Sequence, residues 1–210
     1  MHIPDGFLNA QTWVTMDVVA GLSVAYAIRK TKASLGERQI PLMGVMAAFI
    51  FAAQMLNFPI VGGTSGHLIG GVMAAVLLGP WAATLVMSTI FIVQCLLFQD
   101  GGLTALGANI FNMGIIGTVF GYYIYRGVRI FIGSKKRLFW GVGIASWLAV
   151  VLAATFCSIE LAVSGTVPLR VALPAMASVY ALIGIGEAII TVGVIRLILK
   201  ARPDLLQRYV

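Results

Sequence analysis

The fold class follows from residues 39–99, which read QIPLMGVMAAFIFAAQMLNFPIVGGTSGHLIGGVMAAVLLGPWAATLVMSTIFIVQCLLFQ. These 61 residues contain no Asp, Glu, Lys or Arg. A soluble domain carries roughly 25% charged residues, because its surface must face water. The whole chain of 210 residues has 10% charged and 60% hydrophobic residues, and its mean hydropathy is +1.00. The sequence therefore predicts an all-α polytopic membrane protein.

The number of membrane spans follows from the apolar runs. A helix that crosses a bilayer needs about 20 apolar residues. Such runs occupy residues 10–28, 40–57, 67–79, 81–98, 104–125, 138–162 and 172–198. Residues 67–98 as one helix would be roughly 48 Å long, which exceeds a hydrocarbon core of about 30 Å. Gly79-Pro80 supplies the break, so we expect seven transmembrane helices, of which the third is short and begins below the membrane surface.

The basic residues indicate the orientation, because cytoplasmic loops carry an excess of Lys and Arg. With the N-terminus outside and the C-terminus inside, only Arg170 of the 14 basic residues lies outside. The inside segments hold Arg29, Lys30, Lys32, Arg38, Arg126, Arg129, Lys135, Lys136, Arg137, Arg196, Lys200, Arg202 and Arg208. The net charge of +7 is thus explained by topology and not by nucleic acid. We expect a multi-pass protein of the cell membrane.

Motifs for nucleotide hydrolysis and for common hydrolases are missing from the sequence. It contains no G-x-x-x-x-G-K-[ST] phosphate loop, no HExxH and no GxSxG. We therefore expect no ATP hydrolysis by this chain. Active transport would have to draw on a gradient or on a separate ATPase.

The two histidines, His2 and His67, indicate a metal site on the outer side. A free Met1 amine, the deprotonated His2 backbone nitrogen and the His2 Nδ1 can bind one ion in fused five- and six-membered rings. His67 can supply a fourth nitrogen, and a square plane of nitrogens favours Ni(II) or Cu(II) over Zn(II). Affinity is expected to fall as the pH drops through the histidine range near 6.5. Taken singly, each histidine is also compatible with a polar terminus or a helix cap.

Three segments then resemble one family. The opening Met1-His-Ile-Pro-Asp-Gly-Phe-Leu8 with Trp13, residues 102–114 (GLTALGANIFNMG) and residues 184–191 (GIGEAIIT) are similar to the M subunits (NikM/CbiM-like) of cobalt/nickel importers. These subunits are the substrate-binding S components of energy-coupling-factor (ECF) transporters. The resemblance implies a single transmembrane domain over residues 1–210 that captures Ni(II), or Co(II), outside the cell. Met1, His2 and His67 are then the metal ligands, and no organic cofactor is expected.

The resemblance also implies partners, while the supporting residues are expected from the hydrogen bonding of polar side chains, for which a purely structural role is the alternative. The partners are a transmembrane coupling (T) subunit, ABC-type ATPase subunits and a further small membrane subunit. Around the ligands we expect Glu187, Asn109, Ser65 and Asp5, with Glu187 accepting a hydrogen bond from a ligand such as the Met1 amine. Asn109 would hold the N-terminal segment in place.

Two other function classes remain open from the sequence. A metal-dependent membrane enzyme, such as an intramembrane hydrolase, could use the same two histidines. It lacks an obvious general base beside them, and four nitrogen ligands leave no clear position for a water. The other class is a structural protein without a ligand, and metal uptake by the purified chain would exclude it.

Overall fold

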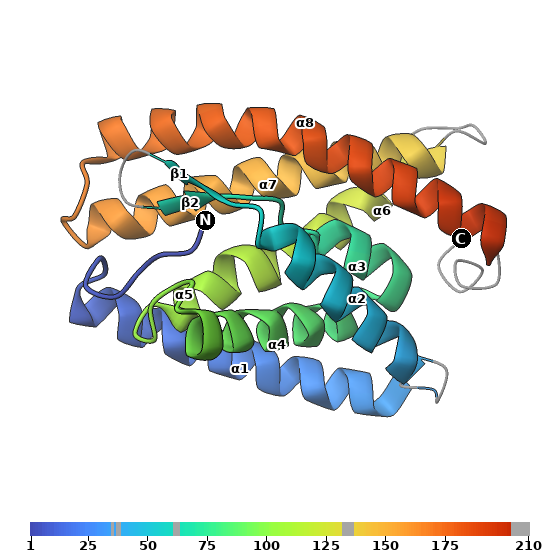
Figure 1. Ribbon diagram of the computed structural model, residues 1–210, viewed down its shortest axis with the longest axis horizontal. Helices are drawn as coiled ribbons and strands as arrows, with labels where there is room; N and C mark the ends of the chain where they lie inside the picture. The colour runs from blue at the N-terminus through green and yellow to red at the C-terminus, as the bar shows by residue number, and fades with distance from the viewer. Residues whose placement is uncertain (35, 37–38, 61–63, 132–136, 203–210) are drawn as a thin grey trace.

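The structure, a computed structural model, describes residues 1–34, 36, 39–60, 64–131 and 137–202. Within these residues, the chain forms helices and one short hairpin (Figure 1). The elements are α1 (Ala10–Ser34), α2 (Gln39–Gln54), β1 (Phe58–Ile60), β2 (Thr64–Gly66), α3 (Gly71–Leu78), α4 (Pro80–Phe98), α5 (Leu106–Asn109), the π-helix η1 (Ile110–Phe120), α6 (Gly121–Phe131), α7 (Arg137–Val163) and α8 (Leu169–Ala201). Because α5, η1 and α6 follow one another without a break, they form one rod. The described rods therefore fit the seven-helix count.

The expected break in the long apolar run is confirmed. Helix α3 ends at Leu78, and α4 begins at Pro80. Gly79 between them has φ 84°, a left-handed region that favours glycine, and proline is pre-organised for the first turn of the next helix. The third rod is therefore only eight residues long.

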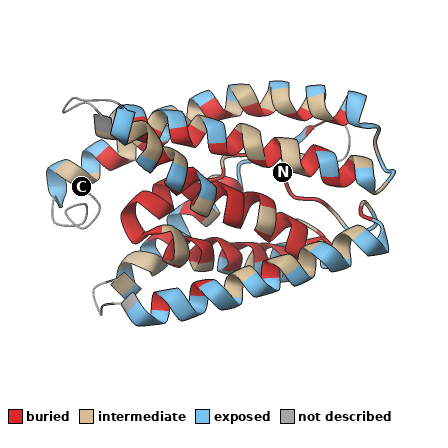
Figure 2. Ribbon diagram, turned by 180° about the vertical axis from the view of Figure 1, so that it is seen from behind, coloured by how far each residue is buried: buried red, intermediate tan, exposed pale blue. Residues whose placement is uncertain are grey.

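Helix α3 lies at the centre of the bundle. Each of its eight residues is buried, and Figure 2 shows the buried residues gathered on the central helices. Helices α7 and α8 pack side by side on one flank, while α1 and α4 lie on the opposite flank (Figure 1). A helix that is apolar all round is stable only when neighbours or lipid cover every face, which explains this placement.

A β-hairpin departs from the expected all-α fold. Strands β1 and β2 pair antiparallel, with Phe58 opposite Gly66. A Cβ on Gly66 would lie 2.6 Å from the Phe58 ring, so the ring covers a position that only glycine leaves open. A strand of three residues is too short to be predicted from an alternation of apolar and polar residues. The hairpin matters because it leads directly into His67.

The described helices agree with a membrane protein. By length and composition, α4, residues 138–163 of α7, and α8 can each cross a bilayer, and α2 is a shorter apolar helix. The last turns of α1, α6 and α8 carry basic residues, and these three helices end at the same end of the bundle (Figure 1). Arg38, Lys135, Lys136 and Arg208 lie outside the described residues. The sidedness of the two termini stays a prediction.

Candidate metal site

The first three residues run into the core of the bundle. Met1, His2 and Ile3 are 0%, 3% and 0% exposed. The backbone of Ile3 is held on both sides by Asn109 of α5: the Ile3 N–H donates to Asn109 Oδ1 at 2.8 Å, and Asn109 Nδ2 donates to the Ile3 carbonyl at 3.2 Å. The Gly102 N–H donates to the same carbonyl at 2.8 Å. The expectation that Asn109 holds the N-terminal segment agrees with these contacts.

Two glycines make room for this segment. A Cβ on Gly102 would lie 2.3 Å from the Asp5 backbone nitrogen, and one on Gly101, at φ +96°, would lie 2.9 Å from Asn109 Nδ2. The exposed Asp5 carboxylate accepts hydrogen bonds from the Leu103 and Thr104 backbone N–H groups at 3.0 and 2.8 Å. Asp5 therefore anchors the segment to the loop after α4 and does not reach the buried nitrogens.

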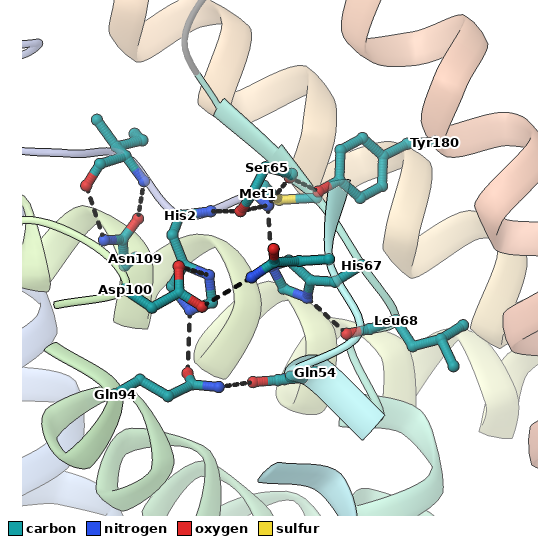
Figure 3. A network of polar contacts seen from close by, with 12 residues as sticks. Met1, His2, Gln54, Ser65, His67, Leu68, Gln94, Asp100, Asn109 and Tyr180 are labelled. Atoms are coloured by element: carbon teal, nitrogen blue, oxygen red, sulfur yellow. Dashed lines mark hydrogen bonds and ion pairs between the residues drawn. The ribbon is translucent and has the colours of Figure 1, made fainter. Parts of the chain in front are cut away.

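The Met1 amine lies beside His67. The two nitrogens, Met1 N and His67 Nε2, are 2.9 Å apart. The amine also donates to the Ser65 carbonyl and, at 3.1 Å, to the Ser65 hydroxyl. His67 Nδ1 lies 2.7 Å from the Leu68 carbonyl oxygen. A carbonyl can only accept a hydrogen bond, so His67 Nδ1 is the donor. The lone pair of the His67 ring is therefore on Nε2, the ring nitrogen that contacts the amine (Figure 3).

His2 stacks on His67, with ring centroids 4.6 Å apart and an angle of 24° between the planes. Its Nε2 lies 3.0 Å from Gln94 Oε1, and its Nδ1 lies 3.3 Å from Asp100 Oδ1. Within the described residues, the buried Nδ1 has no hydrogen-bond partner. The proton of a neutral ring therefore belongs on Nε2, and the contact with Asp100 is no ion pair.

Burial favours the neutral forms of the three groups. It lowers the pKa of the Met1 amine from 8.0 to about 4. Burial, and next the neighbouring amine, lowers the pKa of His2 from 6.5 to about 3, and the pKa of His67 falls well below 6.5 for the same two reasons. Burial also raises the pKa of Asp100 above its usual 3.8. Neutral amines and imidazoles are the forms that bind metal ions.

The geometry fits a chelate built partly from the main chain. Two neighbouring nitrogens of a square plane each lie about 2.0 Å from the ion, and the nitrogen–ion–nitrogen angle is a right angle, so they are about 2.8 Å apart. This is close to the distance between Met1 N and His67 Nε2. In the described part of the chain, no cluster of three or more His, Cys, Asp or Glu side chains could hold a metal ion. The nitrogens that lie together here are the Met1 amine and the imidazoles of His2 and His67.

The predicted hydrogen-bond partner of Glu187, the Met1 amine, is wrong. Its carboxylate accepts hydrogen bonds from the Ile69 and Gly70 backbone N–H groups, at 2.8 and 2.6 Å. The polar partners of the Met1 amine are instead Ser65 and His67. The reason is that the backbone N–H groups before α3 have no partner within their own helix, and a buried carboxylate satisfies them. Glu187 thus fixes the chain that carries His67.

Four residues of the site escaped the sequence analysis. Gln54 and Gln94 are both 0% exposed, and Asp100 and Tyr180 contact His2 and Ser65 respectively. The available signal was the glutamines themselves, because amide side chains inside an uncharged apolar stretch need buried partners. The Tyr180 hydroxyl donates to the Ser65 carbonyl at 2.5 Å, which ties α8 to the hairpin.

Known proteins resemble this chain over nearly its whole length. The family model of the cobalt uptake substrate-specific transmembrane region (CbiM) matches residues 2–205 of this chain. A putative fused nickel transport protein NikMN from Archaeoglobus fulgidus is 43% identical over 210 residues, which cover 99% of this chain and 68% of that protein. A putative metal transport protein from Haloquadratum walsbyi is 39% identical, with 98% of this chain and 93% of that protein covered. A crystal structure of a transition metal transporter has a TM-score of 0.89 at 34% identity, covering 100% of this chain and 97% of that one.

Proposed function

Since the chain belongs to the CbiM family, the cobalt uptake substrate-specific transmembrane regions, we propose that it captures Ni(II), with Co(II) as the alternative, for import into the cell. The ligands are the Met1 amine, the His2 backbone nitrogen, His2 Nδ1 and His67 Nε2. The observation that carries this proposal is the buried contact of the Met1 amine with His67 Nε2, beside the stacked ring of His2. Relatives that are named as nickel transport proteins support the choice of metal.

The chelate requires the His2 backbone nitrogen to lose its proton. That N–H donates to the Ser65 hydroxyl at 3.3 Å, and the proton released when the metal binds goes to the solvent. The five-membered ring then joins the amine to the backbone nitrogen, and the six-membered ring joins that nitrogen to Nδ1. His67 Nε2 closes the plane next to the amine, and such a plane of nitrogens suits Ni(II).

Coupling to ATP belongs to the same proposal. The sequence contains no phosphate loop, so the energy for import comes from ABC-type ATPase subunits through a transmembrane coupling subunit. The metal enters from the outside in this scheme. The alternative of a metal-dependent membrane enzyme has no support among the relatives, which are transport proteins.

The N-terminal amine provides the sharpest test. Adding a short tag before Met1 removes the amine but keeps both histidines, so nickel affinity should fall by at least about tenfold, or about 1.4 kcal/mol. The same tag placed after Val210 is the control and should leave affinity unchanged. Isothermal titration of the purified protein measures both. Equal affinities for the two tagged proteins would exclude the amine as a ligand.

Transport itself is tested in cells. We expect little nickel uptake from this chain alone and strong uptake when it is expressed with its coupling and ATPase subunits. Radioactive nickel accumulation gives the readout, and an ATPase variant without nucleotide hydrolysis serves as the control. Full uptake by the single chain would contradict the coupling scheme.

A further inference from the structure

A chain of buried amides leads from His2 to the backbone before α3. His2 Nε2 lies 3.0 Å from Gln94 Oε1, and Gln94 Nε2 donates to Gln54 Oε1 at 3.0 Å. Gln54 Nε2 in turn donates to the Ile69 carbonyl at 2.7 Å. Both glutamines are 0% exposed, and they come from α2 and α4 (Figure 3). We call Gln54 and Gln94 the amide relay.

The relay has a fixed direction. The Ile69 carbonyl can only accept a hydrogen bond, so Gln54 must present its NH2 group to it. The oxygen of Gln54 then faces Gln94, which must present its own NH2 group there. The oxygen of Gln94 is left for His2, so His2 Nε2 has to be the donor. One backbone carbonyl thereby orients every group up to the imidazole.

His2 also has a competing acceptor on its other side. Asp100 Oδ1 lies 3.3 Å from Nδ1, and a carboxylate attracts a proton more strongly than an amide oxygen does. A proton drawn to Nδ1 would occupy the nitrogen that the chelate needs, since only Nδ1 closes a six-membered ring with the His2 backbone nitrogen. The relay opposes this by holding the single ring proton on Nε2.

We propose that Gln54 and Gln94 are positioning residues, which select the His2 tautomer that leaves Nδ1 free for the metal. This inference rests on the proposed function for its purpose, but the tautomer is a property of the metal-free protein. His67 carries its proton on the opposite atom, Nδ1, because the Leu68 carbonyl accepts from it. The two histidines of the chain thus have opposite tautomers, each with its lone pair on the ligand nitrogen.

Nitrogen-15 NMR of the metal-free protein tests the tautomers directly. The chain has only two histidines, so labelling histidine alone gives four ring nitrogens to assign. We expect His2 to be protonated at Nε2 and His67 at Nδ1. A wild-type spectrum with His2 protonated at Nδ1 would overturn the proposal.

Substitutions in the relay then connect the tautomer to metal binding. Gln94→Leu removes the acceptor, so the His2 proton should move to Nδ1 beside Asp100, and nickel affinity should fall by about tenfold to a hundredfold. Gln94→Glu in its protonated form keeps an oxygen that accepts from His2 Nε2 and an O–H that donates to Gln54 Oε1, so it should retain the wild-type tautomer and lose less affinity than Gln94→Leu. His67 is the internal control, since its tautomer should be the same in every variant. Gln11→Leu, an exposed glutamine of α1, is the matched control.

Gln54→Met covers the case in which Gln94→Leu does not fold. It leaves Gln94 in place but frees its amide to turn, so His2 should show both tautomers, with a smaller loss of affinity. Unchanged tautomer and affinity in folded Gln94→Leu or Gln54→Met would overturn the proposal. A wild-type protein with the expected tautomers that binds no nickel would contradict the proposed function alone.

Discussion

Met1 shows how much of this site belongs to the main chain. Two of the four proposed nitrogens are the terminal amine and a backbone nitrogen, so the position of residues 1 and 2 matters as much as their type. Their neighbours are correspondingly polar: the half-buried Ser65 contacts both nitrogens, and the buried Asn109 holds the next residue. A site of this kind tolerates little displacement of the chain that enters it.

His67 is the only proposed ligand far from the N-terminus in sequence, and its removal leaves the chelate with three nitrogens. We expect His67→Ala to lower nickel affinity by at least about tenfold, or about 1.4 kcal/mol. Thr89→Ala, an exposed position of α4, is the control and should bind as wild type does. Isothermal titration decides, and wild-type affinity in His67→Ala would remove this residue from the site.

The pH dependence of binding follows from the lowered pKa values. The amine and both imidazoles are already neutral at pH 7 in the folded chain, so nickel has to displace only the His2 backbone proton. We expect the logarithm of the affinity to fall by about one for each pH unit between about pH 8 and pH 5. The sequence alone predicts a steeper fall in nickel affinity near pH 6.5. We expect that behaviour only for an unfolded N-terminus.

A synthetic peptide of residues 1–8 provides the comparison. Its amine and imidazole keep ordinary pKa values near 8 and 6.5, so its affinity should fall by about two or three logarithmic units per pH unit. If the nickel affinity of the protein falls as steeply with pH as that of the peptide, the empty site is protonated.

The same lowered pKa values act on folding. The unfolded chain binds more protons than the folded chain, so the free energy of unfolding decreases as the pH falls from about 8 towards about 4.

The loop between α4 and α5 is the element that receives the N-terminal segment. A Cβ at Gly102 would lie 2.3 Å from the Asp5 nitrogen and 2.7 Å from the Pro4 carbonyl carbon, and backbone atoms cannot give way as a side-chain tip can. We therefore expect Gly102→Ala to displace the segment and to lower nickel affinity by about tenfold. Gly21→Ala is the control, because nothing lies within 4 Å of its added Cβ. Titration of both variants measures the difference, and equal affinities would show that the loop adapts.

The elements differ in how far the sequence predicts them. The long helices follow from apolar runs, and the gap between α3 and α4 follows from Gly79 and Pro80. The grouping of Met1, His2 and His67 follows from chelate chemistry together with the family resemblance. The contact between Gln54 and Gln94 could not be predicted, because it depends on how α2 crosses α4. Glu187 was assigned the wrong partner for a similar reason: a buried carboxylate has many candidate donors, and only the packed helices select one.

The bundle as a whole has two unlike ends. The N-terminus and the β-hairpin lie towards the end where α7 meets α8, while the basic last turns of α1, α6 and α8 lie at the other end (Figure 1). Positive residues remain on the cytoplasmic side during insertion, so we expect the basic end to face the cytoplasm. A reporter that is active only in the cytoplasm should therefore work when fused after Val210.

The matched fusion ends the chain in the turn between α7 and α8, after Thr166. There the same reporter should be exported and inactive. The opposite pattern in the two fusions would reverse the orientation, and activity in both would overturn the count of seven spans.

The burial of the site has an electrical consequence. His67 lies before the short central helix α3 and is 1% exposed, so an ion that reaches it has entered the low-dielectric interior of the bundle. In the expected orientation, a divalent cation moves inward along the membrane potential. Because the His2 backbone proton leaves as the ion binds, one net charge moves inward, and each tenth of a 100 mV potential that the ion crosses contributes about 0.2 kcal/mol to its capture. Energised vesicles should therefore hold nickel more tightly than de-energised ones, so that the voltage across the membrane adds to the affinity of the nitrogens.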